Sequence, residues 1–434
     1  MNVLRKHIDP DYILGNIPLA NKLEKPHERY ELGFRWLGEG NLRLTEFVDP
    51  SLMFGNYAYR SSTLSAEHVS SRMTYARRIY DRLNRTRKPR AVCEVACNDG
   101  YMLNRYTGND DRFTTIVGVE PAANLHRYID DKVYAYARLM NARIGASIWN
   151  LHGAFDIIHA HNVLAHTPNP VDLLNGIGAV MDAHSVALIE FQYLVDLLAN
   201  TQFYHFYHEH YYYYTVAGFS NVAEKAGLEM VTAKRVEAQG GSILCTLVRK
   251  GDWNESALKA VASDKSPAAS EELKTGQNIR SNEQDLLSPS LSAQLIQEDP
   301  HQIAHFERNY FSRGDIFANF MKRTERKLKN FVMYVNAQPP GTLAGVFASA
   351  KATVILNLAV ERGLELDRFT CFYDDAEEKW GHCVPGTEIP IRPMRMIGEA
   401  DRRSILFSPN LEALITQRFP DLKVISVENI FEGH

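Results

Sequence analysis

Long apolar runs and an excess of charge of one sign are both missing from this sequence. No apolar run approaches the roughly 20 residues of a membrane-spanning helix, because the most apolar stretch, 187–199, is broken by Glu190, Gln192 and Asp196. The 48 Lys and Arg residues nearly balance the 52 Asp and Glu residues, which disfavours a protein that binds nucleic acid by neutralising phosphates. The N-terminal residues lack the apolar core of a signal peptide, so we expect a cytoplasmic protein that binds neither nucleic acid nor membrane.

Cysteine is also scarce: the 434 residues contain five, and none precedes Cys93. An odd number of cysteines, most of them in apolar strand-like runs, does not fit a secreted disulfide framework. Cys93 and Cys97 are four residues apart and could begin a metal site, but no second close pair follows. We therefore expect free, buried thiols. The hydrophobic content of 45% suits a globular chain of about three domains.

Short apolar runs alternate with helix-length segments in the middle of the chain. A helix is predicted at 64–86 from its apolar spacing, and four strands at 90–96, 114–119, 154–160 and 185–191. Segments 228–235 and 242–249 look like an antiparallel ending to the same sheet. Strands that alternate with helices predict a parallel sheet with helices on both faces. The expected fold class is therefore α/β.

The remaining segments differ from this central part. Residues 1–70 are rich in turns, and 252–300 are polar, which indicates an insertion or flexible linker with short helices. A basic helix is expected at 315–335. A second, smaller open sheet follows, with strands at 344–347, 369–375, 404–409 and 422–427 and a helix at 350–362. We divide the chain into an N-terminal lobe (1–85), a central domain (86–250), an insertion and helix (251–335) and a C-terminal α/β lobe (336–434).

The first candidate site is the turn after the first central strand, with Glu94, Cys97, Asn98, Asp99 and Gly100. Small residues there let the backbone approach a ligand closely. The next strand ends in Glu120-Pro121, where a carboxylate can accept hydrogen bonds from ribose hydroxyls. Only one glycine of a dinucleotide fingerprint is present, and the acidic turn would repel phosphate, so a nucleoside with a sulfonium or ammonium group fits better. The alternative is a strand–turn–helix junction without a ligand.

Histidines follow two other strands. His159, His161 and His166 leave the carboxyl end of one strand, where they could be metal ligands, general bases or polar residues at a rim. The run 203–214 is the densest titratable and aromatic cluster of the chain and contains His208, Glu209 and His210. Histidine suits proton abstraction near neutral pH, and tyrosines can donate hydrogen bonds to an oxyanion or a sugar hydroxyl. The alternatives are an aromatic strand or helix with surface histidines, or a metal site that adds His161 or His166 to His208 and His210, although the spacing matches no zinc signature.

Several motifs in order resemble one enzyme family. EVACNDGYML, GVEPAANL, HNVLAHTPNP, EFQYLVDLLANTQFYHFYHEHYYY and QGGSILCTL are similar to the nucleotide-sugar C-methyltransferases that build branched deoxysugars. GVFASAKATVILNL and VPGTEIPI extend the resemblance to the C-terminal lobe. It covers nearly the whole chain apart from 252–300.

The resemblance implies a Rossmann-like class I methyltransferase core that uses S-adenosylmethionine and no metal. The methyl group would go to a carbon next to a ketone, typically C-3 of a dTDP-4-keto-deoxysugar. His210 would be the general base, assisted by Tyr207, Glu209 and His166. The turn residues above, with Glu120 and Pro121, would bind the cofactor together with Asn162, Val163 and Leu164. The acceptor would contact Tyr59, His208, Lys351 and Asn357.

The chain also departs from the family. Ala96 stands where the family has glycine, and Ala352 and Val354 interrupt a motif that resembles sugar-nucleotide contacts. The four zinc-binding cysteines of the family's N-terminal domain are absent. We predict that this lobe folds without zinc through apolar packing of Phe34, Trp36, Leu42 and Phe47.

Other functions remain open at this point. The same scaffold could methylate oxygen or nitrogen of another natural-product acceptor, with His210 deprotonating a hydroxyl. A non-catalytic protein that binds the cofactor, or a metal-dependent hydrolase built on the histidine cluster, would be a different class. The expected partner is a small-molecule acceptor, and the expected assembly is a monomer or small homo-oligomer.

Overall fold

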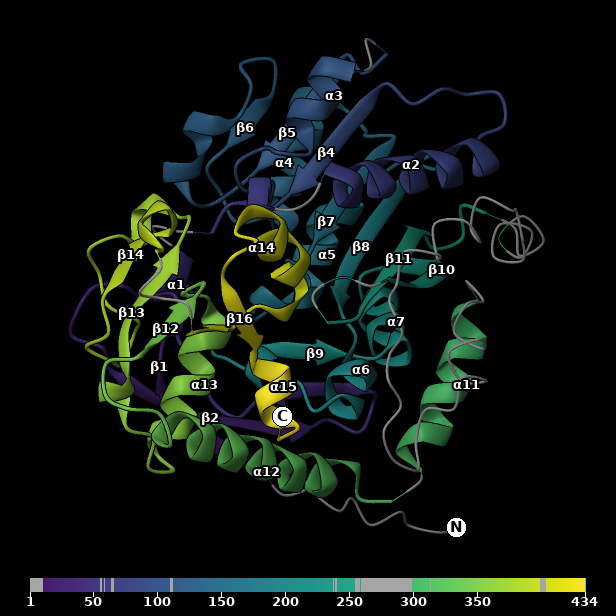
Figure 1. Cartoon of the computed structure of the whole chain (residues 1–434). Helices are drawn as coiled ribbons and strands as arrows, with labels where there is room; N and C mark the ends of the chain where they lie inside the picture. The colour runs from purple at the N-terminus through teal and green to yellow at the C-terminus, as the bar shows by residue number, and fades with distance from the viewer. Residues whose placement is uncertain are drawn as a thin grey trace, which may run out of the picture.

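Three β-sheets organise the chain in the computed structural model (Figure 1). The structure describes residues 11–54, 57, 59–63, 66–109, 112–236, 238, 240–253, 258, 299–312, 314–398 and 403–433. The interpretation of 252–300 as an insertion or linker lies almost entirely outside these residues.

The central sheet has seven strands in the order β10-β11-β8-β7-β4-β5-β6. Strands β4 to β8 run parallel to one another, and β11 is antiparallel to both β8 and β10. This arrangement confirms the predicted α/β fold and its antiparallel ending, whereas the short edge strand β6 was not expected. The strands are β4 (Ala91–Val95), β5 (Thr115–Val119), β6 (Tyr134–Tyr136), β7 (Ile157–His161), β8 (Val186–Gln192), β10 (Leu228–Val236) and β11 (Ser242–Arg249).

Helices connect these strands and begin at clear sequence signals. The side chain of Asn141 caps α4 by accepting a hydrogen bond from Ile144 N (2.9 Å), and Pro170 opens α5, a position where its missing N–H costs nothing. Glycines let these two helices approach closely, because a Cβ at Gly145 would lie 2.3 Å from the Gly176 carbonyl. The helices of this part are α2 (Ala66–Leu83), α3 (Leu103–Asn109), α4 (Ala142–His152), α5 (Pro170–Ala179), α6 (Leu194–Ala199) and α7 (Val216–Lys225).

The N-terminal lobe is a four-stranded antiparallel sheet, and its last strand comes from far along the chain. Strands β1 (Tyr12–Pro18), β2 (Arg29–Trp36) and β3 (Asn41–Leu44) pair in sequence, and β3 then pairs with β9 (Tyr212–Tyr214). A short helix, α1 (Ser51–Phe54), follows β3. The aromatic run 203–214 therefore becomes a short 3₁₀ turn, a loop that carries the histidines, and a strand that completes the N-terminal sheet.

Apolar packing holds this lobe, with one difference from the prediction. Phe34 and Leu42 are fully buried, and Trp36 packs on Phe311 and Phe317 with ring centroids 4.7 and 5.3 Å apart. Phe47 was expected in the core and is instead 41% exposed. It follows β3, and the rings of Tyr211 and Tyr212 meet it edge-on while the Arg43 guanidinium lies 5.6 Å from its ring centroid.

The C-terminal lobe contains the smaller open sheet that the sequence predicts, and the structure shows that its strands are parallel. Its order is β14-β13-β12-β15-β16, and the unexpected strand is β14. Helix α12 runs beside α13 and α15 and also contacts β1, along the lower edge of Figure 1. Helix α11 (Pro300–Phe311) comes earlier in the chain and packs on α7 and β10 of the central domain. The elements that follow it are α12 (Ile316–Asn336), β12 (Leu343–Val346), α13 (Ala350–Val360), β13 (Phe369–Asp374), β14 (Ile391–Pro393), β15 (Arg403–Leu406), α14 (Glu412–Arg418), β16 (Lys423–Ser426) and α15 (Val427–Phe431).

One large hydrophobic core joins the three sheets. It contains Phe34 of β2, Phe206 of the aromatic run, Phe320 of α12 and Leu356 of α13, so the N-terminal lobe packs on both other parts. The short 3₁₀ helices of the described residues are η1 (Ser61–Thr63), η2 (Ala123–Tyr128), η3 (Leu164–His166), η4 (Phe203–His205), η5 (Leu366–Arg368), η6 (Glu377–Lys379), η7 (Met394–Met396) and η9 (Pro409–Leu411).

The state of the cysteines agrees with the prediction of free thiols. All five thiols are free; Cys383 is partly exposed and the other four are buried. None of the helices in the described part of the chain combines the length and the apolar character that a membrane span requires.

Candidate active site

The turn after β4 bends sharply. Ala96, Asn98 and Gly100 have φ angles of 56°, 53° and 71°. Residues with a Cβ atom rarely adopt this left-handed backbone conformation. Ala96 N donates to the Val119 carbonyl (2.7 Å), which ties the turn to the end of β5. Alanine therefore occupies a glycine-like position here without loss of the turn.

Three buried carboxyls surround this turn. Glu120 at the end of β5 accepts hydrogen bonds from Asn98 N (2.9 Å) and Ala122 N (2.8 Å), so it holds the turn and keeps free lone pairs. Glu94 Oε2 and Asp99 Oδ1 are buried and accept no hydrogen bond from the described residues. Burial, with the nearby Asp99 and Glu120, raises the pKa of Glu94 well above its usual range. Two buried acceptors without donors would suit a ligand that brings an ammonium group.

A segment that precedes α2 crosses over this turn. We call residues 57 and 59–63 the crossing segment. Ser61 N and Ser62 N donate to Asn98 Oδ1 (2.8 Å) and Asp99 Oδ2 (3.1 Å). Tyr57 exchanges two hydrogen bonds with the side chain of Asn124, at 3.3 and 3.0 Å. The crossing segment is thereby attached to both loops that follow β4 and β5.

The histidines after β7 separate into two groups. His159 and His161 lie in a buried chain of hydrogen bonds that runs from Tyr106 through His159, His161 and Glu190 to Arg72, with distances of 2.8 to 3.0 Å. Burial and the neighbouring His161 hold the pKa of His159 well below its usual range. The loop then turns at Asn162, whose φ is 54° and whose N–H donates to the Glu190 carbonyl (2.8 Å). Val163 is partly buried and Leu164 fully buried.

His166, the third histidine, lies beside His210. Their rings meet edge to face with centroids 4.7 Å apart, because Tyr211 N donates to the Ala165 carbonyl (2.8 Å) and joins the two loops. Burial lowers the pKa of His166 to about 4 and that of His210 well below its usual range. Both rings are therefore neutral at physiological pH.

His210 has a defined tautomer. Its Nδ1 lies 3.0 Å from the His205 carbonyl, which only accepts hydrogen bonds, so Nδ1 carries the proton. Nε2 is then the acceptor, and the Tyr207 hydroxyl donates to it at 2.9 Å. Tyr207 is partly exposed, whereas His210 is 4% exposed.

Glu209 is held by residues from the first sixty of the chain. Its carboxyl accepts hydrogen bonds from Asn21 Nδ2 (2.7 Å) and the Tyr57 hydroxyl (3.3 Å). Burial raises the pKa of Glu209 to about 7, although these hydrogen bonds oppose the shift. Neither Asn21 nor Tyr57 was singled out from the sequence. Tyr57 stands two residues before Tyr59 in an alternating run, so this alternation is a signal that could have found it. No sequence feature near Asn21 indicates its contact with Glu209.

The four residues expected at the acceptor have different surroundings. Tyr59 is 40% exposed, and Lys351 lies 5.9 Å from the Tyr204 ring, with a pKa that burial lowers to about 8. His208 is 1% exposed and its Nε2 donates to the Glu31 carbonyl (3.1 Å). Asn357 is fully buried and its amide is occupied, since it bonds Arg29, the Thr353 carbonyl and the Pro385 carbonyl. Tyr59 and Lys351 are therefore better placed to meet an acceptor.

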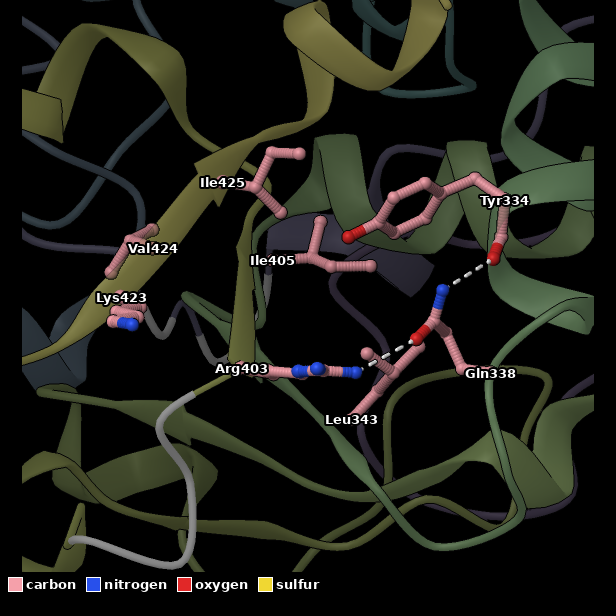
Figure 2. A pocket seen from close by; sticks show the side chains of 8 residues that line it. All are labelled: Tyr334, Gln338, Leu343, Arg403, Ile405, Lys423, Val424 and Ile425. Carbon is pink, nitrogen blue, oxygen red and sulfur yellow. Dashed lines mark hydrogen bonds between the residues drawn. The ribbon is translucent and has the colours of Figure 1, made fainter. Parts of the chain in front are cut away.

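The pocket in Figure 2 lies away from these groups. It has a volume of 290 Å³ and lies between α12 and the amino ends of β12, β15 and β16. Arg403 reaches Gln338 across it (3.4 Å). The sheet end that carries Lys351 is the opposite one.

As for metals, no three His, Cys, Asp or Glu side chains converge on one point within the described ranges.

Family models and one curated relative match most of the chain. The family model "Methyltransferase domain" matches residues 66–233, and "C-methyltransferase C-terminal domain" matches 277–426. The C-methyltransferase NovU of Streptomyces niveus is 27% identical over 355 residues, which are 81% of this chain and 73% of that protein.

Two solved structures resemble part of the chain. The plantazolicin methyltransferase BamL is 11% identical, with a TM-score of 0.35 over 43% of this chain and 85% of that one. A TehB-like methyltransferase from Corynebacterium glutamicum is 15% identical, with a TM-score of 0.28 over 43% of this chain and 100% of that one. With a methyltransferase domain and a C-methyltransferase C-terminal domain in one chain, the protein is an S-adenosylmethionine-dependent methyltransferase that is similar to the C-methyltransferases.

Proposed function

We propose that the enzyme methylates a carbon next to a ketone on a nucleotide-linked keto-deoxysugar, with His210 as the general base. The observation that carries the proposal is the hydrogen bonding of the His210 ring. Its Nδ1 proton is committed to the His205 carbonyl, so the Nε2 lone pair is the one available to take a proton. A neutral imidazole with a fixed tautomer is the form that a general base requires.

Tyr207 would change partners when the acceptor binds. Its hydroxyl donates to His210 Nε2 at 2.9 Å, and burial raises its pKa well above the usual range, so it remains a donor. A ketone oxygen can take this hydrogen bond, and Nε2 is then free for the proton on the neighbouring carbon. The same hydroxyl would stabilise the enolate oxygen that forms.

Other charged groups of the site fit the same step. Lys351 is a cation whose pKa burial lowers to about 8, and its charge helps to keep His210 neutral. Placed near the enolate, it would offset the negative charge. Glu209 interacts electrostatically with the hydroxyls of Tyr57 and Tyr207. In its ionised form it would accept a hydrogen bond from a sugar hydroxyl and orient the acceptor, with Tyr59 beside it.

The turn after β4 fits the cofactor. Glu94 and Asp99 offer buried oxygen atoms without donors to the ammonium group of S-adenosylmethionine, and Glu120 keeps lone pairs for the ribose hydroxyls. The loop at 162–164 would close this site from the end of β7. When bound, the cofactor supplies an electrophilic methyl group. The protein's own part is to exclude water, hold the acceptor carbon near that group and remove its proton.

The test uses proton exchange as well as methyl transfer. Candidate keto-sugar nucleotides are incubated in D₂O with enzyme and cofactor, and the new methyl group and the deuterium are located by NMR. His210→Asn should abolish both exchange and methylation and keep S-adenosylhomocysteine binding in calorimetry. The exposed His305→Asn on α11 is the matched control. Methylation of oxygen or nitrogen, or full activity of His210→Asn, would refute the proposal.

A further inference from the structure

We propose that Asn21 of the N-terminal lobe is a positioning residue for the methyl transfer, because its side-chain amide fixes the ionised carboxylate of Glu209 at the acceptor side of the site. The inference rests on the proposed function in so far as Glu209 orients the acceptor there. It gives the N-terminal lobe a role in the chemistry as well as in the fold.

The geometry places Asn21 directly on the carboxyl group. Asn21 Nδ2 donates to Glu209 Oε1 at 2.7 Å, the shorter of the two side-chain hydrogen bonds that this carboxyl accepts. The two residues are 188 positions apart in sequence, and Glu209 is 1% exposed. Solvent therefore cannot replace the amide as a donor without a change in the packing.

The backbone around Asn21 is itself fixed from two sides. Leu19 is buried in a small apolar cluster with Val48, Met53 and Tyr211, and Tyr211 lies two residues after Glu209. The carbonyl of Ala20 accepts a hydrogen bond from Thr353 Oγ1 of α13 (3.2 Å), and Lys22 N donates to the Leu19 carbonyl (3.3 Å). Asn21 thus lies in a turn that Thr353 of the C-terminal lobe and Tyr211, close to Glu209, hold in place.

The groups that face Glu209 are mostly neutral. Tyr57, Tyr207 and Tyr211 interact with its charge, and the His166 ring interacts electrostatically with its main chain. In the described part of the chain Glu209 forms no ion pair. Burial raises its pKa to about 7, and the side chain of Asn21, then Tyr57, then the main chain of Asn21 oppose this rise.

An amide suits this position better than a cation would. A carboxylate only accepts hydrogen bonds, so the donor stabilises the ionised form over the protonated one. A lysine or arginine would form a strong buried pair and occupy the carboxylate permanently. The amide adds no charge, so Glu209 can still bind a hydroxyl of the acceptor.

The first test is the pH profile of kcat for Asn21→Leu, which removes the side-chain donor and keeps a side chain of similar branched shape. The loss of a charge-assisted hydrogen bond should move the acid limb upward by about one to two pH units, so activity falls at pH 7 and recovers at high pH. Asn21→Ser, which restores a donor, should move the limb part of the way back. Lys22→Ala is the control. An equal loss at every pH, with affinity for S-adenosylhomocysteine unchanged, would indicate a merely structural role and overturn the proposal.

The second test needs no acceptor and so separates this inference from the proposed function. A buried Glu with a raised pKa binds its proton more tightly in the folded state, so its contribution to stability is lost as the pH rises through about 7. In Asn21→Leu that loss should extend to higher pH, seen as a lower Tm between pH 7 and 9 than in wild type. The pH-dependent part of this difference should vanish in the Glu209→Gln background. Its persistence there would refute the contact, whereas failure of methylation alone would refute only the proposed function.

Discussion

Replacing Phe34 with alanine tests whether apolar packing alone holds the N-terminal lobe. Phe34 is fully buried in β2. Its ring centroid lies 5.5 Å from Tyr12 of β1, 5.1 Å from Phe206 of the aromatic run and 6.0 Å from Phe320 of α12. It therefore contacts the lobe itself, the loop before the histidines and the first long helix of the C-terminal part. A metal-free lobe should depend strongly on such a residue.

The expected cost follows from the burial. Removing a fully buried phenylalanine side chain costs roughly 3–5 kcal/mol in lost transfer energy and cavity formation. Phe47 in the same lobe is 41% exposed, so its removal should cost about 1 kcal/mol. The difference between the two variants is more reliable than either value, because effects on the unfolded chain largely cancel.

Urea unfolding followed by tryptophan fluorescence measures both variants. Trp36 packs on Phe317, a neighbour of Phe34, and reports directly on the lobe. The free energies of unfolding should differ by at least about 2 kcal/mol between Phe34→Ala and Phe47→Ala, and a chelator should not change the result. Equal losses for both variants, or a transition that a chelator shifts, would refute the reasoning.

Two further predictions concern buried charges. Arg72→Met should destabilise the fold by about 3–5 kcal/mol at pH 7, because Glu190 is left as an unpaired buried charge. Burial alone would raise the pKa of Glu190, but Arg72 and His161 outweigh burial and hold this pKa below its usual value of 4.5. The ion pair therefore stabilises the fold above pH 4.5, and this stabilisation is lost as the pH falls. Urea unfolding at several pH values should show the variant's deficit shrinking in acid and in the Arg72→Met/Glu190→Gln double variant; a deficit independent of pH would contradict this. Glu120→Gln should weaken S-adenosylhomocysteine binding in calorimetry by about tenfold or more, whereas the exposed Glu39→Gln should not, and equal affinities would argue against Glu120 as the ribose ligand.

The central and C-terminal sheets could be predicted because their strands are buried on both faces. Runs such as 90–96 and 185–191 are nearly all apolar, and each is bounded by turn residues. The N-terminal strands were missed because they are short, separated by prolines and glycines, and stabilised by a distant partner. The aromatic run that contains Tyr212–Tyr214 could be a strand or a helix by its sequence; this part of it is a strand because β3 offers an edge to it.

The candidate site could be predicted where one loop carries several of its groups, and could not where the fold brings distant groups together. Tyr207, Glu209 and His210 stand within four residues, and the structure places His166 beside His210. The role of His159 and His161 was left open by the sequence, because only the structure shows that Arg72 and Glu190 continue their hydrogen bonds. Asn21 could not be found at all, since the contact depends on a turn 188 residues away from Glu209.

The pairing of β3 with β9 sets the order in which the chain can fold during synthesis. Asn41 pairs with Tyr214, so the first three strands leave the ribosome and then wait for roughly 170 more residues, on the order of ten seconds or longer at ordinary translation rates. Throughout that time β3 presents an unpaired edge, and the apolar face of the sheet has nothing to cover it. The segment made first therefore completes its fold late. We expect slower translation to lengthen this exposure and chaperones that bind apolar segments to act on residues 11–44.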